Sequence, residues 1–214
     1  MRRLNSLNKT FSQMVKASLL ASCLLPLAFV LAQDGNEAQL LQLASAGETE
    51  AALELISRRT DVNQAQSDGT TALHWAIYYD DEDLVRQLIR RGADVTARNE
   101  FGATPLSQAT IIGNPDIIKR ILDAGANPNE TGADDQTAIM IIARTDNINT
   151  ARVLLDAGAD VNSVEQWRGQ TALMWSAAQR QPEMLALLLE HGADPDAQSL
   201  PNNWERQVTA EPRM

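Results

Sequence analysis

Four stretches of this chain repeat one another at an almost constant spacing. Each begins with a threonine and ends with a glycine: Thr71, Thr104, Thr137 and Thr171, then Gly92, Gly125, Gly158 and Gly192. Both series advance by 33, 33 and 34 residues. A fixed period of this length is typical of repeat proteins, in which each unit buries its apolar surface against its neighbours. The spacing therefore predicts a solenoid rather than one globular core.

The residues within each unit predict two helices joined by a polar turn. The threonine hydroxyl can cap the first helix, which is worth about 1 kcal/mol relative to alanine. Pro105 suits the first helical position, and Asn114, followed by Pro115, suits the start of the second helix. The second helices carry apolar pairs one turn apart, which predicts a buried stripe of Leu84, Val85, Leu88 and Ile89, then Ile117, Ile118, Ile121 and Leu122, then Met184, Leu185, Leu188 and Leu189. The closing glycine fits a left-handed turn.

The order of these signals resembles the ankyrin repeat. Threonine opens the motifs TALH, TPLS, TAIM and TALM, two helices follow, and Gly-Ala-Asp or Gly-Ala-Asn closes each unit. The resemblance covers roughly 160 of the 214 residues. It implies an all-α ankyrin-repeat solenoid of stacked helix-turn-helix units with β-hairpin or loop tips.

The repeats divide the chain into a series of predicted segments. These are a signal peptide (1–32), a degenerate N-terminal capping repeat (33–65), four regular repeats (66–98, 99–131, 132–165 and 166–198) and an irregular C-terminal tail (199–214). We expect the extra residue of the 34-residue period near Val164 and Glu165, in a hairpin. The tail contains no further repeat. Either Trp204 and Val208 fold over the last repeat, or the sequence is a piece of a longer array, which is the alternative that we favour.

The first 32 residues predict export from the cytoplasm. A basic, polar start precedes an apolar run from Ala17 to Leu31, and small residues then stand before a polar stretch. This pattern is typical of a signal peptide cut after Ala32, and it predicts a periplasmic or secreted protein. A membrane anchor is less favoured because a span needs about 20 apolar residues. A minor alternative is lipidation at Cys23, where Leu-Ala-Ser-Cys resembles a lipoprotein motif.

Charge narrows the classes of partner. Residues 33–214 hold 14 basic and 28 acidic residues, a net charge of −14. Nucleic-acid binding needs a basic surface, and an anionic membrane surface also attracts basic segments. We therefore expect neither partner. The charge can steer a basic protein, or it can be only a solvated acidic surface.

Few residues suggest catalysis, so we expect no enzymatic activity, no cofactor and no metal. The resemblance implies that His74 bonds the backbone between repeats, and His191 suits a helix C-terminus. The run Asp80–Asp83 lacks the spacing and the glycine of a calcium loop, and we expect it to cap a helix instead. Trp75 and Trp175 share one repeat position, where we expect core packing.

The resemblance also implies where a protein partner binds, namely the concave surface formed by hairpin tips and first helices. The tip positions are Asp68, Phe101, Asp134, Asp135, Trp167 and Arg168. The positions near the end of the first helix are Tyr78, Tyr79, Ile111, Ile112, Arg144, Thr145 and Gln179. We expect a monomer that binds an unidentified protein. The alternative is that this chain is the recognition fragment of a larger secreted multidomain protein or enzyme whose other domain lies beyond residue 214.

Overall fold

A computed structural model describes residues 36–57, 60–132 and 135–200. The predictions for the signal peptide, Cys23, Asp134, Trp204 and Val208 lie outside these residues. Within the described ranges the chain forms ten helices, taken in pairs. They are α2 (Asn36–Ala46) and α3 (Thr49–Ser57), α4 (Ala72–Tyr78) and α5 (Glu82–Arg90), α6 (Pro105–Ile112) and α7 (Pro115–Asp123), α8 (Ala138–Ile142) and α9 (Ile148–Asp156), and α10 (Ala172–Gln179) and α11 (Pro182–Glu190).

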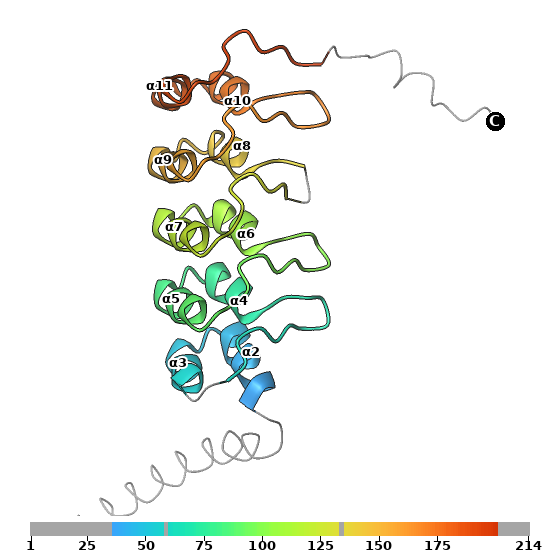
Figure 1. Ribbon diagram of the computed structural model, residues 1–214, viewed down its shortest axis with the longest axis vertical. Coiled ribbons are helices and arrows are strands. Elements are labelled where there is room, and N and C mark those ends of the chain that lie inside the picture. Colours follow the sequence, from blue (N-terminus) through green and yellow to red (C-terminus); the bar gives the residue numbers. More distant parts are fainter. Residues whose placement is uncertain (1–35, 58–59, 133–134, 201–214) are drawn as a thin grey trace, which may run out of the picture.

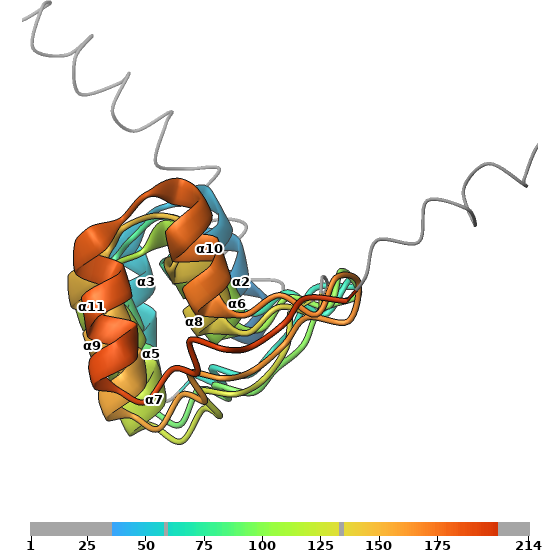
Figure 2. The same cartoon turned by 90° about the horizontal axis from the view of Figure 1, so that it is seen from above.

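The helix pairs stack in chain order into one elongated column (Figure 1). Helices α2, α4, α6, α8 and α10 form the inner layer, and α3, α5, α7, α9 and α11 form the outer layer, with neighbours in each layer in contact. The connecting hairpins project to one side, next to the inner layer (Figure 2). Their pairing in the described residues is limited to isolated bridges such as Ala65 to Thr71. The predicted all-α solenoid is confirmed.

The first helices start as predicted at some threonines and differently at others. The hydroxyl of Thr104 accepts from the N–H of Ser107 at 3.1 Å, and that of Thr171 accepts from Met174 at 3.3 Å. The same prediction is wrong for Thr137, whose buried hydroxyl has no hydrogen bond. Its helix, α8, spans only five residues. Since capping contributes about 1 kcal/mol, this start is less stabilised than those at Thr104 and Thr171.

The outer helices of the interior units bury most of the predicted stripe, but Ile89 and Leu122 are only half-buried, so the prediction is partly right there. Leu88 and Ile121 are fully buried, and burial of such a side chain contributes about 1.5–3 kcal/mol. In α11 the prediction is wrong for Leu185, which is half-buried, and for Leu189, which is 46% exposed. Leu187 is buried instead.

The exposed leucines belong to an end face on the last unit. This end face consists of Leu173, Ala177, Leu185 and Leu189, which are exposed or half-buried. The residues that correspond to Ala177 in the three preceding units are Ile77, Thr110 and Ala143, all buried. Each is covered because the next unit stacks on it. Among the described residues, no unit stacks on the end face.

The closing glycines take left-handed backbone conformations, as predicted. The φ angle of Gly125 is +103°, and a side chain there would meet no atom within 4 Å. The requirement for glycine is therefore conformational rather than steric.

A row of side-chain bridges joins consecutive units beyond the closing glycine. At three junctions an asparagine side chain forms two hydrogen bonds to the next unit. Its amide N–H donates to the carbonyl of that unit's closing glycine, and its amide oxygen accepts from the backbone N–H of the aspartate two residues after this glycine. The three asparagines are Asn63, Asn129 and Asn162. The two distances at Asn129 are 3.1 and 2.6 Å. Thr96 holds the equivalent position at the remaining junction, where its hydroxyl donates to Asp94 of its own loop at 2.7 Å. That junction therefore lacks the bridge.

The extra residue of the 34-residue period lies within the hairpin tip. In the other hairpins the backbone hydrogen bond at the tip joins residues three positions apart, as from Gly102 N–H to Asn99 O. In the last hairpin it joins residues four positions apart, from Gly169 N–H to Glu165 O. The buried Glu165 carboxylate accepts from the N–H groups of Trp167 at 2.7 Å, Arg168 at 2.8 Å and Gln170 at 3.1 Å. The longer tip is thus held by one acidic side chain.

None of the helices in the described residues is long and apolar enough to span a bilayer.

Candidate binding groove

The groove is the surface between the projecting hairpins and the inner helices. Two of the predicted residues near the ends of the inner helices are strongly exposed, Tyr78 at 57% and Ile111 at 75%. At the tips, Phe101 is 72% and Trp167 is 84% exposed. Large apolar side chains that remain this accessible often mark interfaces.

Tyr78 belongs to an aromatic cluster with Trp75 and Tyr79. The ring of Tyr78 meets Trp75 edge-on at 5.8 Å, and Tyr79 stacks on Trp75 at 6.4 Å. The Tyr79 hydroxyl donates to Ser45 O at 2.9 Å, and its ring lies against Gly47. Tyr79 therefore also fastens the first helix pair to the second. Tyr78 has no such hydrogen bond in the structure, and it is the freer of the two tyrosines.

The prediction that the two tryptophans belong to the core is only partly right. Trp75 packs against the core but stays half-buried and contributes to the surface of the groove. Trp175 is also half-buried, and the guanidinium of Arg144 lies 4.8 Å above its ring. A cation in this position is attracted by the ring quadrupole. Arg144 therefore has a partner within the chain.

The remaining predicted residues near the ends of the inner helices differ in their surroundings. Ile112 is 40% exposed. Thr145 and Gln179 are exposed, and the hydroxyl of Thr145 donates to Ile142 O at 3.0 Å. The surface formed by these positions is thus most apolar in the first two regular units and becomes polar towards α10.

The hairpin tips are ordered by short side-chain bonds. Asp68 accepts from the N–H of Thr70 at 2.9 Å, and this bond is the largest cause that lowers the pKa of Asp68 below its ordinary value. Asp135 has a φ of +54°. Arg168 is exposed, and its carbonyl accepts from the N–H of Leu200 at 2.7 Å.

One concavity joins the tips to the inner helices. It has a volume of about 330 Å³ and lies between the first two regular hairpins. Its lining includes Asp68, Trp75, Tyr78, Asn99, Phe101 and Gln108. It brings together three residues predicted from the sequence, namely Asp68, Tyr78 and Phe101.

Comparison with protein families agrees with this architecture. A family model described as ankyrin repeats (3 copies) matches residues 18–99, 40–132 and 106–199. The chain belongs to the ankyrin repeat family. Ankyrin repeats are generally protein–protein interaction modules. A search of curated protein sequences found no significant match.

His74 bonds between neighbouring ankyrin units, as predicted. Its Nδ1 accepts from the N–H of Thr71 at 3.2 Å, so that the proton lies on Nε2, which is 3.3 Å from Ala103 O of the next unit. Burial lowers the pKa of His74, so the ring stays neutral and keeps this pattern. The residue holds the two units together.

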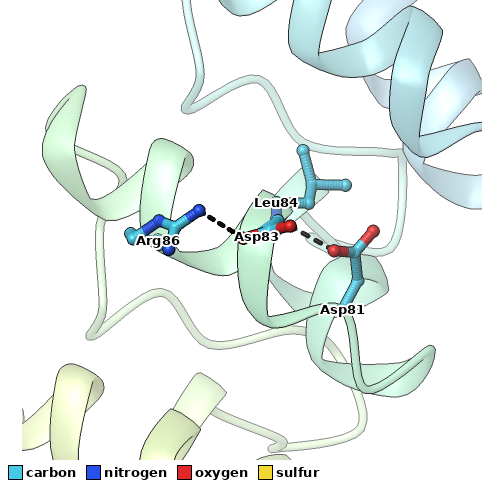
Figure 3. Close-up of polar contacts among 4 residues, drawn as sticks. All are labelled: Asp81, Asp83, Leu84 and Arg86. Carbon is cyan, nitrogen blue, oxygen red and sulfur yellow. Dashed lines mark hydrogen bonds and ion pairs between the residues drawn. The ribbon is translucent and has the colours of Figure 1, made fainter.

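The acidic run at the start of α5 is committed to helix capping and to bonds between ankyrin units. Asp81 accepts from the N–H of Leu84 at 2.9 Å, and Asp83 pairs with Arg86 (Figure 3). The other two members of the run, Asp80 and Glu82, both accept from the side chain of Asn114 in the next unit. In the described part of the chain, no cluster of three or more histidine, cysteine or acidic residues is placed to hold a metal ion.

Sequence reasoning missed three residues of this ankyrin groove. Asn99 and Gln108 line the concavity, and Glu165 fixes the tip that carries Trp167. The signal for Gln108 was available, because it occupies the same repeat position as Trp75. Asn99 and Glu165 lie in hairpins, where the polar pattern does not indicate the direction of a side chain.

Proposed function

We propose that this protein is a non-enzymatic, monomeric binding module that holds a folded protein in its ankyrin groove. One observation carries the proposal. Among the described residues, the exposed large apolar side chains lie on the inner helices and the hairpins, and Leu189 of the end face is the exception on the outer layer. Exposed apolar side chains that gather on one side often mark a binding site, and aromatic residues such as Tyr78 and Phe101 are enriched in interfaces.

The stacked architecture supports binding by a preformed surface. Consecutive units contact one another in both layers, share one apolar core, and are also bridged by an asparagine at three of the four junctions in the described residues. A surface that is already ordered loses less conformational entropy when it binds. The net charge of −14 for residues 33–214, from 14 basic and 28 acidic residues, favours a partner with a basic surface.

The test is capture of a partner from extracts of the source organism by the immobilised protein. The groove variant carries Tyr78→Asp and Ile111→Asp. The matched control carries Asn149→Asp and Ala186→Asp, which add the same charge at exposed positions of the outer layer. Circular dichroism should show equal helicity for all three proteins. We expect a protein retained by the unaltered chain and the control but lost by the groove variant; equal retention by both variants would refute the groove.

We further propose that the protein works outside the cytoplasm. The signal-peptide pattern of residues 1–32 supports this proposal. Mass spectrometry of the protein from its source should give Gln33 as the first residue. A protein that retains residues 1–32 without modification would contradict export by cleavage, and a lipid-modified Cys23 would establish the alternative anchor.

A second candidate is that the chain is the recognition part of a larger protein. The observation in its favour is the end face, together with the bond from Leu200 N–H to Arg168 O, which repeats the bond from Glu100 N–H to Asp68 O between interior hairpins. Residues up to Leu200 thus begin a hairpin of the same kind. An immunoblot of the source organism should then show a product longer than 214 residues; a product of this length or shorter would count against the candidate.

A further inference from the structure

The concavity between the first two regular hairpins combines aromatic rings with a carboxylate. Trp75 and Tyr78 belong to α4, while Asp68 and Phe101 belong to successive hairpin tips, and all four line the same space of about 330 Å³. This volume is near the lower end of ligand pockets, which span roughly 300–1,000 Å³. It therefore suits one long side chain better than a large ligand.

The carboxylate of Asp68 is available to a cation. Its bonds from the Thr70 N–H, at 2.9 Å, and from the Thr70 hydroxyl use only part of its about four acceptor positions. The same bonds lower the pKa of Asp68, so the group is ionised at neutral pH. No ion pair of Asp68 with a cationic side chain occurs in the described residues.

The chain itself shows how a guanidinium sits on this tryptophan position. Trp175 and Trp75 occupy equivalent places three units apart, and the guanidinium of Arg144, from the preceding unit, lies 4.8 Å from the Trp175 ring. The residue that corresponds to Arg144 in the unit before Trp75 is Ser45. At Trp75 the approach from the preceding unit is instead taken by Tyr79, which stacks on the ring at 6.4 Å and donates to Ser45 O. The part of Trp75 left for a cation is the part that lines the concavity with Asp68 and Phe101.

From this arrangement we infer that the concavity binds an arginine side chain of the partner. The planar guanidinium can lie against the aromatic rings and also donate two parallel hydrogen bonds to Asp68, a combination that a lysine ammonium cannot form. The inference rests on the proposed function and specifies the chemistry of the partner at one point of the groove.

The test is a titration of the purified, ¹⁵N-labelled protein with Nα-acetylargininamide, followed by the indole N–H resonance of Trp75 in NMR spectra. Nα-acetylcitrullinamide, which has the same shape without the charge, and Nα-acetyllysinamide serve as comparison ligands. Asp68→Asn removes the charge but keeps an acceptor for Thr70. Asp156→Asn is the matched control, since it removes one exposed carboxylate from the outer layer, away from the groove.

We expect saturable shifts with the arginine compound at millimolar concentration, and binding about tenfold weaker for the citrulline compound and at least threefold weaker for the lysine compound. Asp68→Asn should reduce the preference for arginine over citrulline to less than twofold, while Asp156→Asn should leave it unchanged. Equal binding of arginine and citrulline, tighter binding of lysine, or equal effects of the two variants would overturn the inference. The titration needs no partner, so its failure is distinguishable from failure of the capture experiment.

Discussion

Replacing Thr96 by asparagine should stabilise the protein. At three other junctions an asparagine in this position bridges consecutive units, with distances of 3.1 and 2.6 Å at Asn129. The groups that would receive the new bridge are Gly125 O and the N–H of Asn127, which the repeat register places in the equivalent positions and which form no hydrogen bond in the structure.

The size of the effect follows from the bonds gained and lost. A hydrogen bond contributes about 0.5–1.5 kcal/mol net, and the equivalent bridges are solvent-exposed, which favours the lower end. Two new bonds therefore contribute about 1–1.5 kcal/mol. The substitution also removes the bond from the Thr96 hydroxyl to Asp94, so the net gain should be about 0.5–1 kcal/mol. The reverse change, Asn129→Thr, should cost a similar amount.

Urea unfolding followed by circular dichroism measures both variants. With a slope of about 2 kcal/mol per molar urea, Thr96→Asn should raise the midpoint by about 0.25–0.5 M, and Asn129→Thr should lower it similarly. Thr96→Asp is the control, because it supplies the acceptor of the bridge without the donor and should gain less. A lower midpoint for Thr96→Asn, or no effect of Asn129→Thr, would refute this account of the junctions.

Two further predictions concern the turns. Gly125→Val should lower the unfolding free energy by about 1–2 kcal/mol or more, because a branched side chain is strained at a φ of +103°; an unchanged urea midpoint would contradict this. For Glu165, burial raises the pKa, but the backbone N–H groups of Gln170, Trp167 and Arg168 lower it below 4.5. The stabilisation of the fold by the ionised Glu165 carboxylate should be fully present above the unfolded-state pKa. It should be lost as the pH falls through the lower folded-state pKa. Glu165→Gln should therefore be less stable at pH 7, by about 1–2 kcal/mol for the weakened charge-assisted bonds, and urea melts should show a smaller difference below pH 4.

The helix pairs and their register could be predicted from the sequence because threonine, proline and glycine act locally. The cap at Thr104 and the turn at Gly125 depend on the nearest few residues. The stripe prediction failed at Leu185, whose equivalents Val85 and Ile118 are fully buried, because its burial depends on whether a further unit stacks on it, which no pattern within one unit reveals.

The groove was predictable only in part. The tip positions of Phe101 and Trp167 follow from the repeat register, and both are exposed. The sequence could not show that Tyr79 donates to Ser45 or that Arg144 lies on Trp175, because these contacts join units about 33 residues apart. Only such contacts, seen in the structure, distinguish the residues that hold the repeats together from the residues that remain free to bind a partner.

The central claim, that the groove holds the partner, can be tested directly by hydroxyl-radical footprinting of the protein with and without the captured partner. The proposal predicts reduced oxidation of Tyr78 and Phe101 in the complex. Val153, which lines a hollow of about 210 Å³ on the outer layer, should react equally in both states. Protection of Val153 with unchanged oxidation of Tyr78 and Phe101 would place the partner on the outer layer and contradict the account.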